Sequence, residues 1–143
     1  MQSPSEQPAP IIPPIQNHCF GCGPANPQGL QLEFTLIDDK RVVCLTNIPD
    51  RFESFSGYLH GGVIATLLDE AMSKAVRSLG VKAMTSQMEI DYLRPVPSLK
   101  PIRIEGVLVR SEGRKHWAEA QVLNAKGSVL AKSKGLFVQI RTR

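Results

Sequence analysis

The sequence predicts an α+β fold in which a curved antiparallel β-sheet wraps around one long helix. One segment, from residue 60 to Gly80, carries a wide apolar stripe with helical spacing, and six segments around it have the patterns of β-strands. The chain has 143 residues, of which 42% are hydrophobic, and this is ordinary for one globular domain with its own core. No apolar run approaches the roughly 18 residues of a membrane span, so no membrane partner is expected.

Two strands are expected before the helix. Residues 30–36 alternate leucine and phenylalanine with polar side chains, and residues 41–48 form the next strand after a turn at 38–40. Upstream, residues 17–30 are dense in Gly, Pro and Asn, which predicts a turn-rich loop. Residues 1–16 contain five of the eleven prolines and are expected to form a flexible arm outside the globular domain, which spans residues 17–143.

Four strands are expected after the helix. The first runs from Met84 to the Arg94-Pro95 pair, and the others cover 102–110, 116–123 and 129–140. Turns at 111–113 and 124–127 separate the last three strands. The apolar stripe is wide enough for the helix to fill the hollow of a single curved sheet, and this arrangement is the hot-dog fold.

The helix places one carboxylate at an unusual position. At about 100° of turn per residue, Glu70, Lys74 and Arg77 fall on one solvent-facing side. A wide apolar arc next to this side contains residues 63, 64, 67, 68, 71, 72, 75, 76 and 79. Asp69 falls at the border of this arc rather than among the charged residues. Because border carboxylates are often rim residues bonded to a neighbour such as Ser73, position alone leaves the role of Asp69 open.

The residues His60-Gly61-Gly62 directly precede the apolar stripe. The first N–H groups of a helix lack intrahelical partners and carry the positive end of its dipole, and two glycines leave them unshielded by side chains. This predicts a site for the oxyanion of a carbonyl group that becomes tetrahedral, with Asp69 supplying the reactive oxygen. The alternative, that the glycines only permit a tight entry into the helix, is weakened by Asp69 eight residues after Gly61.

Gly61 and Asp69 lie too far apart to act on one carbonyl group within one chain. Eight residues of helix separate them by about 12 Å, whereas a reacting carbon must lie about 3 Å from both groups. Two antiparallel helices from two subunits satisfy this requirement. The chemistry therefore predicts at least a homodimer, with two sites across its two-fold interface.

Basic residues gather towards the C-terminus. The net charge is +4, but residues 1–99 contain seven Lys and Arg against ten Asp and Glu, and residues 100–143 contain ten against three. This distribution suits an anionic partner such as nucleic acid, a membrane surface or a nucleotide-bearing small molecule. A solvated basic face explains this charge distribution equally well, so the charge alone does not identify a partner.

Three motifs together resemble the PaaI-type hot-dog acyl-CoA thioesterases, and within them the mitochondrial long-chain subgroup. They are His60-Gly61-Gly62 with Asp69, YLRPVP at 92–97 and EGRK at 112–115, and the resemblance covers residues 17–140. It implies hydrolysis of an acyl-CoA substrate without a further cofactor, by a homodimer or a dimer of dimers. Some relatives carry a polar amide residue six positions before the histidine, where this chain has Ser54.

The resemblance also implies roles for individual residues. Asp69 is expected to act as general base on water or as nucleophile, Gly61 to donate its N–H to the thioester carbonyl, and Thr85 to position the water. His60 is counted with these catalytic residues. The residues expected to bind the substrate, coenzyme A in particular, are Gly62, Asp91, Arg94, Arg114 and Lys115. Arginine and lysine suit the phosphates of coenzyme A, which gives the basic C-terminal segment a purpose.

The segment HCFGC raises the alternative of a metal site. His18, Cys19 and Cys22 supply three ligands, whereas a structural zinc normally needs four. The other candidates are Cys44, His60 and His116. They show no paired spacing, so no metal site is expected. Three cysteines cannot build a disulfide framework, and the N-terminus lacks a basic start and an apolar segment, which together predict a cytoplasmic protein with thiols.

A non-catalytic module that binds acyl-CoA or a protein partner is the second hypothesis. Asp69 discriminates between the two, because a binding module needs no carboxylate beside the thioester carbon. A hot-dog dehydratase is disfavoured, since the Gly-His-Phe-Pro setting of its histidine is absent. Nucleic-acid binding is disfavoured too, because only eight aromatic residues are present and they form no stacking pattern interleaved with the basic residues.

Overall fold

The computed structural model describes residues 17–141, and the chain divides into two compact units, Met1–Leu32 and Glu33–Arg143. The proline-rich arm expected at residues 1–16 lies outside the described residues. In the larger unit, two strands, a helix and four strands follow one another in the predicted order. Among the described residues, no helix has the length and apolar character needed to cross a bilayer.

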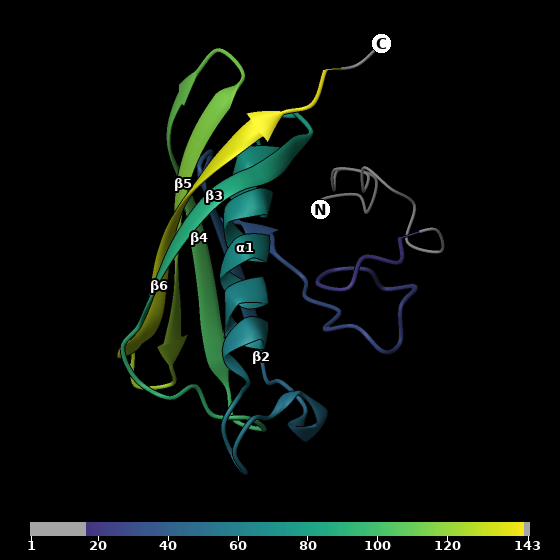
Figure 1. Ribbon diagram of the computed structural model, residues 1–143, viewed down its shortest axis with the longest axis vertical. Coiled ribbons are helices and arrows are strands. Elements are labelled where there is room, and N and C mark those ends of the chain that lie inside the picture. The colour runs from purple at the N-terminus through teal and green to yellow at the C-terminus, as the bar shows by residue number, and fades with distance from the viewer. Residues whose placement is uncertain (1–16, 142–143) are drawn as a thin grey trace, which may run out of the picture. The chain divides into compact units, whose positions relative to one another are not determined.

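The larger unit contains one α-helix and one sheet (Figure 1). Strands β1 (Thr35–Leu36) and β2 (Arg41–Thr46) precede a short 3-10 helix, η3 (Asp50–Phe52), and the helix α1 (Gly61–Arg77). Strands β3 (Ala83–Tyr92), β4 (Ile102–Glu112), β5 (Lys115–Asn124) and β6 (Val129–Gln139) follow. All neighbouring strands are antiparallel, in the order β1-β2-β4-β5-β6-β3, and the sheet lies along one side of α1. The predicted helix and antiparallel sheet are confirmed.

The strand expected at residues 30–36 is wrong for most of its length. Only Thr35 and Leu36 belong to β1. Gln31 has a φ of 51°, which is incompatible with an extended strand, and the N–H groups of Leu30 and Leu32 bond to carbonyls of the preceding loop at 2.8 and 2.9 Å. The alternation of leucines at 30 and 32 therefore reports burial within a loop rather than a strand, since both side chains are buried.

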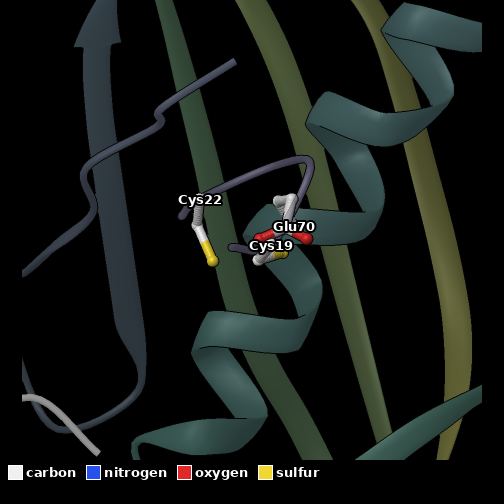
Figure 2. Close-up of side chains that lie close together, drawn as sticks. All are labelled: Cys19, Cys22 and Glu70. Atoms are coloured by element: carbon white, nitrogen blue, oxygen red, sulfur yellow. The ribbon is translucent and has the colours of Figure 1, made fainter. Parts of the chain in front are cut away.

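The described part of the N-terminal unit, residues 17–32, is a loop closed by turns. The carbonyl of Cys19 accepts a hydrogen bond from the N–H of Gly23 at 2.8 Å, and the carbonyl of Asn17 accepts one from Ala25 at 3.0 Å. Figure 2 draws Cys19 and Cys22 on this loop, together with Glu70, which belongs to α1 of the larger unit. The turn-rich loop predicted at residues 17–30 is confirmed.

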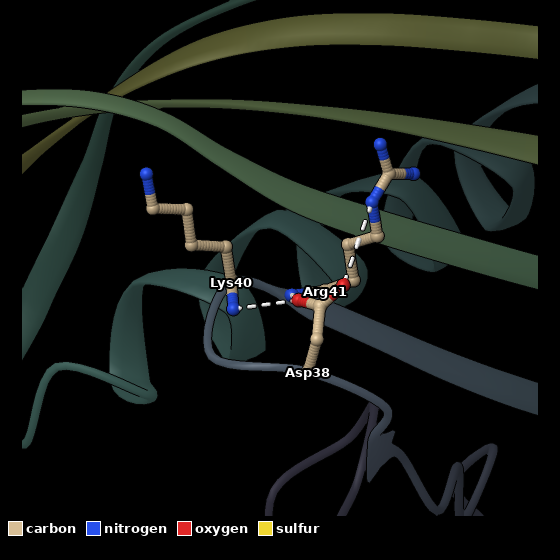
Figure 3. Close-up of polar contacts among 3 residues, drawn as sticks. All are labelled: Asp38, Lys40 and Arg41. Atoms are coloured by element: carbon tan, nitrogen blue, oxygen red, sulfur yellow. Dashed lines mark hydrogen bonds and ion pairs between the residues drawn. The ribbon is translucent and has the colours of Figure 1, made fainter.

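The turn between β1 and β2 is held by Asp38 (Figure 3). Its Oδ1 accepts the N–H groups of Lys40 at 2.9 Å and Arg41 at 2.8 Å. The hydrogen bond from Lys40 is the main cause that lowers the pKa of the Asp38 carboxyl, and the Arg41 N–H and both positive charges act in the same direction. An aspartate that bonds the backbone ahead of it is typical of such turns, and this one sets the register of β1 against β2.

The helix buries one face against the sheet. The fully buried side chains of α1 follow the predicted apolar stripe: Leu67, Leu68, Ala71, Met72 and Ala75. On β4, a Cβ at Gly106 would lie 2.2 Å from the carbonyl oxygen of Ala71, so only glycine permits this close approach of helix and strand. This contact fixes the distance between α1 and the sheet, and it therefore fixes the residues at the ends and sides of α1 relative to the sheet.

Candidate active site

Helix α1 begins with one open backbone donor. His60 is its N-cap, and Nδ1 of His60 accepts the N–H of Gly62 at 2.9 Å. The carbonyl of His60 accepts the N–H groups of Val63 and Ile64, both at 3.0 Å. Of the first four N–H groups of the helix, only that of Gly61 has no hydrogen-bond partner within residues 17–141. The expectation that both glycine donors are open is therefore wrong for Gly62, because the His60 side chain occupies its N–H.

Strand β3 also contacts the first turn of α1, through its last residue, Tyr92. The hydroxyl of Tyr92 donates to the carbonyl oxygen of Gly61 at 2.9 Å. A Cβ on Gly61 would lie 3.9 Å from the Tyr92 ring, which is ordinary contact. Sequence reasoning assigned no role to Tyr92, although the YLRPVP motif contains it and the alternation along β3 places it with Met88 and Ile90. That alternation was the signal that could have found it.

A pocket of about 370 Å³ opens beside Gly61. Its walls come from the loop before α1, from α1 itself and from the segment after β3. The lining residues are Ser54, Phe55, Tyr58, Leu59, Gly61, Ile64, Tyr92, Leu93, Arg94, Pro95 and Val96. This lining is mostly apolar and aromatic, while Ser54 and Arg94 contribute polar side chains to the same pocket as Gly61. Such a pocket suits an apolar group next to a polar acceptor.

The predicted carboxylate lies in the third turn of α1. Asp69 is half-buried, and its Oδ1 accepts a hydrogen bond from the hydroxyl of Thr85 on β3 at 2.7 Å. Its Oδ2 has no hydrogen-bond partner in the described part of the chain. The Thr85 hydroxyl uses its one proton in the hydrogen bond to Asp69, so the hydroxyl oxygen of Thr85 can only accept a further hydrogen bond. The structure thus brings together Asp69 and Thr85, which the sequence paired only through a family resemblance.

An irregularity of β3 allows two of its residues to face α1. Thr85 and Tyr92 both bond to this helix, although residues seven apart in a regular strand point to opposite faces of a sheet. The register of β3 against β6 shifts between Thr85 and Gln87, which inserts one extra residue. This bulge reverses the alternation and places Thr85 and Tyr92 on the same side. Asp91, next to Tyr92 in a regular part of the strand, points to the other face.

The predicted coenzyme A residues divide between the two ends of the sheet. Lys115 pairs with Val138, and Asp91 pairs with Lys132 six residues away on β6, so the two lie about 20 Å apart. Thr85 pairs with Phe137, at the same end as Lys115. Arg114 is fixed at that end, because its Nε and Nη2 donate to the carbonyl of Gln139 at 3.1 and 2.8 Å.

Two half-sites follow from this division. The donor half-site contains His60, Gly61, Gly62, Tyr92 and Arg94. The acid half-site contains Asp69 and Thr85, with Arg114 and Lys115 at the same end of the sheet. One chain does not bring the two together, since about 12 Å of helix separates Gly61 from Asp69.

Strand β3 forms an edge of the sheet with one side unpaired. It has ten residues, and among the strands within residues 17–141 it pairs only with β6. Large apolar side chains are exposed on it and just after it, with exposed fractions of 63% for Met84, 54% for Tyr92 and 52% for Leu93. A long edge strand with open N–H and C=O groups is a template for pairing with another strand.

The candidate metal ligands do not gather within the larger unit. His60 uses Nδ1 for Gly62, and the buried His116 pairs Nδ1 with the hydroxyl of Ser111 at 2.8 Å. Cys44 is 2% exposed, and burial raises the pKa of its thiol. His18, Cys19 and Cys22 belong to the N-terminal unit, where Figure 2 draws the two cysteines. The absence of a metal site stays a prediction.

Comparison with known proteins gives a consistent family. Residues 56–131 match the family model described as the thioesterase superfamily. The Bos taurus protein named acyl-coenzyme A thioesterase THEM4 is 32% identical over 116 residues, which are 78% of this chain and 48% of its own. The chain spans about half the length of the curated relatives it matches.

Solved structures agree with this match. The crystal structure of a thioesterase superfamily protein is 28% identical with a TM-score of 0.79, and the match covers 91% of this chain and 72% of the other. A thioesterase protein of Streptococcus pneumoniae, solved with coenzyme A, is 25% identical with a TM-score of 0.72, over 78% of this chain and 88% of its own. Two further structures of the pneumococcal protein, each 23% identical to this chain, carry alanine in place of a threonine and of an aspartate. The predicted hot-dog fold is confirmed.

Proposed function

This chain belongs to the thioesterase superfamily, and we propose that it hydrolyses the thioester bond of acyl-coenzyme A to a free acid and coenzyme A. The observation that carries the proposal is the presence, on one helix, of an open Gly61 N–H and an Asp69 carboxylate bonded to Thr85. The names of the relatives, acyl-coenzyme A thioesterases, support it. Coenzyme A bound to the pneumococcal thioesterase protein supports the same substrate class.

Asp69 acts at the thioester carbon, as general base on a water molecule or as nucleophile. As base, it takes a proton while the water oxygen bonds to the carbon; the C–S bond then breaks, and coenzyme A leaves as a thiolate that recovers a proton. The Thr85 hydroxyl, an acceptor beside Asp69, positions the water. The two substituted positions of the pneumococcal protein have the same separation along the chain as Asp69 and Thr85, which supports this pair.

Gly61 stabilises the oxyanion. Its N–H is the open donor at the positive end of α1, so it can bond the carbonyl oxygen as negative charge develops. The pocket beside it accommodates the neighbouring apolar part of the substrate. His60 supports this donor as the helix cap, and Gly62 contributes through that cap rather than as a second donor.

Arg114 and Lys115 bind the phosphates of coenzyme A. Both side chains are exposed on the hairpin between β4 and β5, and Nη1 of Arg114 makes no hydrogen bond to any residue the structure describes. Guanidinium and ammonium groups suit phosphate oxygens. Arg94 and Asp91 lie at the opposite end of the sheet. In the dimer they contact the substrate whose phosphates are bound by the partner subunit.

The complete site forms between two subunits. Antiparallel pairing of two copies along the open edge of β3 brings the donor half-site of one chain to the acid half-site of the other. The dimer, its further pairing into a dimer of dimers, and the cytoplasmic location stay predictions. Native mass spectrometry checks the first two directly.

The test is release of free thiol from acyl-CoAs of graded chain length and aromaticity, without added metal. Thioesterase activity predicts turnover of at least one member by the wild-type chain. No release from any member by folded protein contradicts the proposal and favours the non-catalytic binding module, for which binding of coenzyme A without turnover is the expected result.

A further inference from the structure

We propose that Tyr92 is a positioning residue for this reaction, which holds the first turn of α1 so that the Gly61 N–H points at the substrate carbonyl. The inference rests on the proposed function and deepens it. It assigns a task to a side chain that neither contributes a reactive group nor belongs to the helix it acts upon. The support comes from the way both ends of one peptide group are bonded.

The peptide group between Gly61 and Gly62 is bonded at both ends. Its carbonyl oxygen accepts the Tyr92 hydroxyl at 2.9 Å, and its N–H donates to Nδ1 of His60 at 2.9 Å. The preceding peptide group, between His60 and Gly61, is bonded only through its carbonyl, which accepts the N–H groups of Val63 and Ile64. The one N–H that remains open therefore lies directly beside a peptide plane that cannot rotate without breaking two hydrogen bonds.

Two consecutive glycines make this restraint necessary. Glycine populates a wide range of φ and ψ angles, so a pair of them at the start of a helix leaves the first turn poorly determined by itself. An oxyanion donor is effective when it is aimed before the reaction and needs no reorganisation during it. Gly61 and Gly62 give the substrate access to the helix terminus, while Tyr92 and His60 remove the freedom that comes with them.

Tyr92 is itself held firmly at the end of β3. The next two N–H groups, those of Leu93 and Arg94, both donate to the carbonyl of Leu130 at 2.9 Å. Tyr92 pairs with Ala131 in the regular part of the β3–β6 ladder. The hydroxyl therefore extends from a backbone anchored to the sheet, and it fixes the helix terminus relative to the sheet rather than to the helix alone.

The test compares two variants that each remove one hydroxyl bonded to a carbonyl of the first turn of α1. Tyr92→Phe removes the bond to the Gly61 carbonyl and keeps the ring. The matched control, Thr66→Val, removes a hydroxyl bond of 3.0 Å to the next carbonyl, that of Gly62, and keeps the side-chain shape. For both variants, kcat and KM are measured with an acyl-CoA that the wild-type chain hydrolyses, together with hydrogen–deuterium exchange of residues 60–64.

Tyr92→Phe is expected to lower kcat about tenfold with KM within about twofold of wild type, because aiming the donor matters most in the transition state. Exchange at residues 60–64 is expected to accelerate in this variant, and Thr66→Val is expected to change neither kcat nor this exchange. Wild-type kcat in Tyr92→Phe, a change confined to KM, or an equal fall in both variants would overturn the inference. If the wild-type chain hydrolyses no acyl-CoA, the proposed function fails, and unchanged exchange in Tyr92→Phe separately refutes the restraint.

Discussion

The two half-sites differ in the kind of chemistry they contribute and in how they are built. The donor half-site presents a backbone N–H, and consecutive residues, His60-Gly61-Gly62, create most of it through local helix geometry. The acid half-site presents a side chain, and Asp69 depends on Thr85, sixteen residues later in the chain, to fix its carboxylate. Neither half-site is complete by itself, and about 12 Å of helix separates them.

This difference explains why, in the proposed mechanism, one helix contributes to two active sites. A helix terminus can present a donor only at its end, and a side chain on the same helix lies wherever its turn places it. Because both positions are rigid, the chain cannot fold its two half-sites onto one carbonyl group. In the dimer proposed above, a second copy paired antiparallel along β3 would satisfy both positions without any change in either chain.

Removing the carboxylate tests the acid half-site most severely. Asp69→Asn keeps the shape and an oxygen that accepts from Thr85, but it loses the base or nucleophile. General-base catalysis contributes typically about 10²–10⁴-fold, so kcat is expected to fall at least about a hundredfold while coenzyme A affinity stays near wild type. The control is Glu119→Gln, the same change of charge at an exposed glutamate on β5, which is expected to keep full kcat. Full activity in Asp69→Asn would remove the assigned role.

Mixing two inactive variants tests whether the half-sites combine across subunits. Gly61→Val is expected to be inactive, because its side chain fills the space beside the open N–H and the Tyr92 ring. In a heterodimer with Asp69→Asn, one site carries both changes and the other carries neither. Random exchange makes half of the dimers mixed, so about a quarter of wild-type activity is expected to return. Subunit exchange confirmed by mass spectrometry, with no return of activity, would show that each chain acts alone.

A smaller effect is expected from disturbing the cap of the donor half-site. In Gly62→Ala the new Cβ lies 3.2 Å from Nδ1 of His60, which displaces the ring and weakens its bond to the Gly62 N–H. Loss of an N-cap bond costs about 1 kcal/mol, whereas Gly→Ala in a helix restores about as much, so the melting temperature should stay within a few degrees. The value of kcat is expected to fall about fivefold. An unchanged kcat would mean that the His60 cap does not aim the Gly61 donor.

The smallest effect concerns the exposed basic residues near the acid half-site. Arg114→Ala is expected to raise KM for acyl-CoA about three- to fivefold, because an exposed charge contact contributes up to about 1 kcal/mol. KM for an acyl-pantetheine thioester, which lacks the nucleotide, should stay unchanged. Arg103→Ala, at an arginine that pairs with Glu105 on β4, is the control and should alter neither value. Equal effects on both substrates would exclude phosphate binding by Arg114.

Local patterns of the sequence were sufficient for most of the fold. The apolar stripe of α1, the alternation along β4, β5 and β6, and the breaking turns predicted the element order because each depends on residues close together in the chain. The one clear error, the strand at 30–36, has the same origin. Leucines at 30 and 32 are spaced as in a strand, but the positive φ of Gln31 and hydrogen bonds to the preceding loop decide their conformation.

The sequence by itself determined that Gly61 starts a helix and that Asp69 follows on the border of its apolar face, because helical periodicity and capping are local properties. Which donor stays open depends on the rotamer of His60, and the pattern of residue types does not specify this rotamer. Only the tertiary structure decided that Thr85 and Tyr92 face the same helix. A bulge in β3 reverses the alternation between them, and bonds spanning 16 and 31 residues join them to α1. Such contacts depend on how strand and helix pack, which no local pattern of residues specifies.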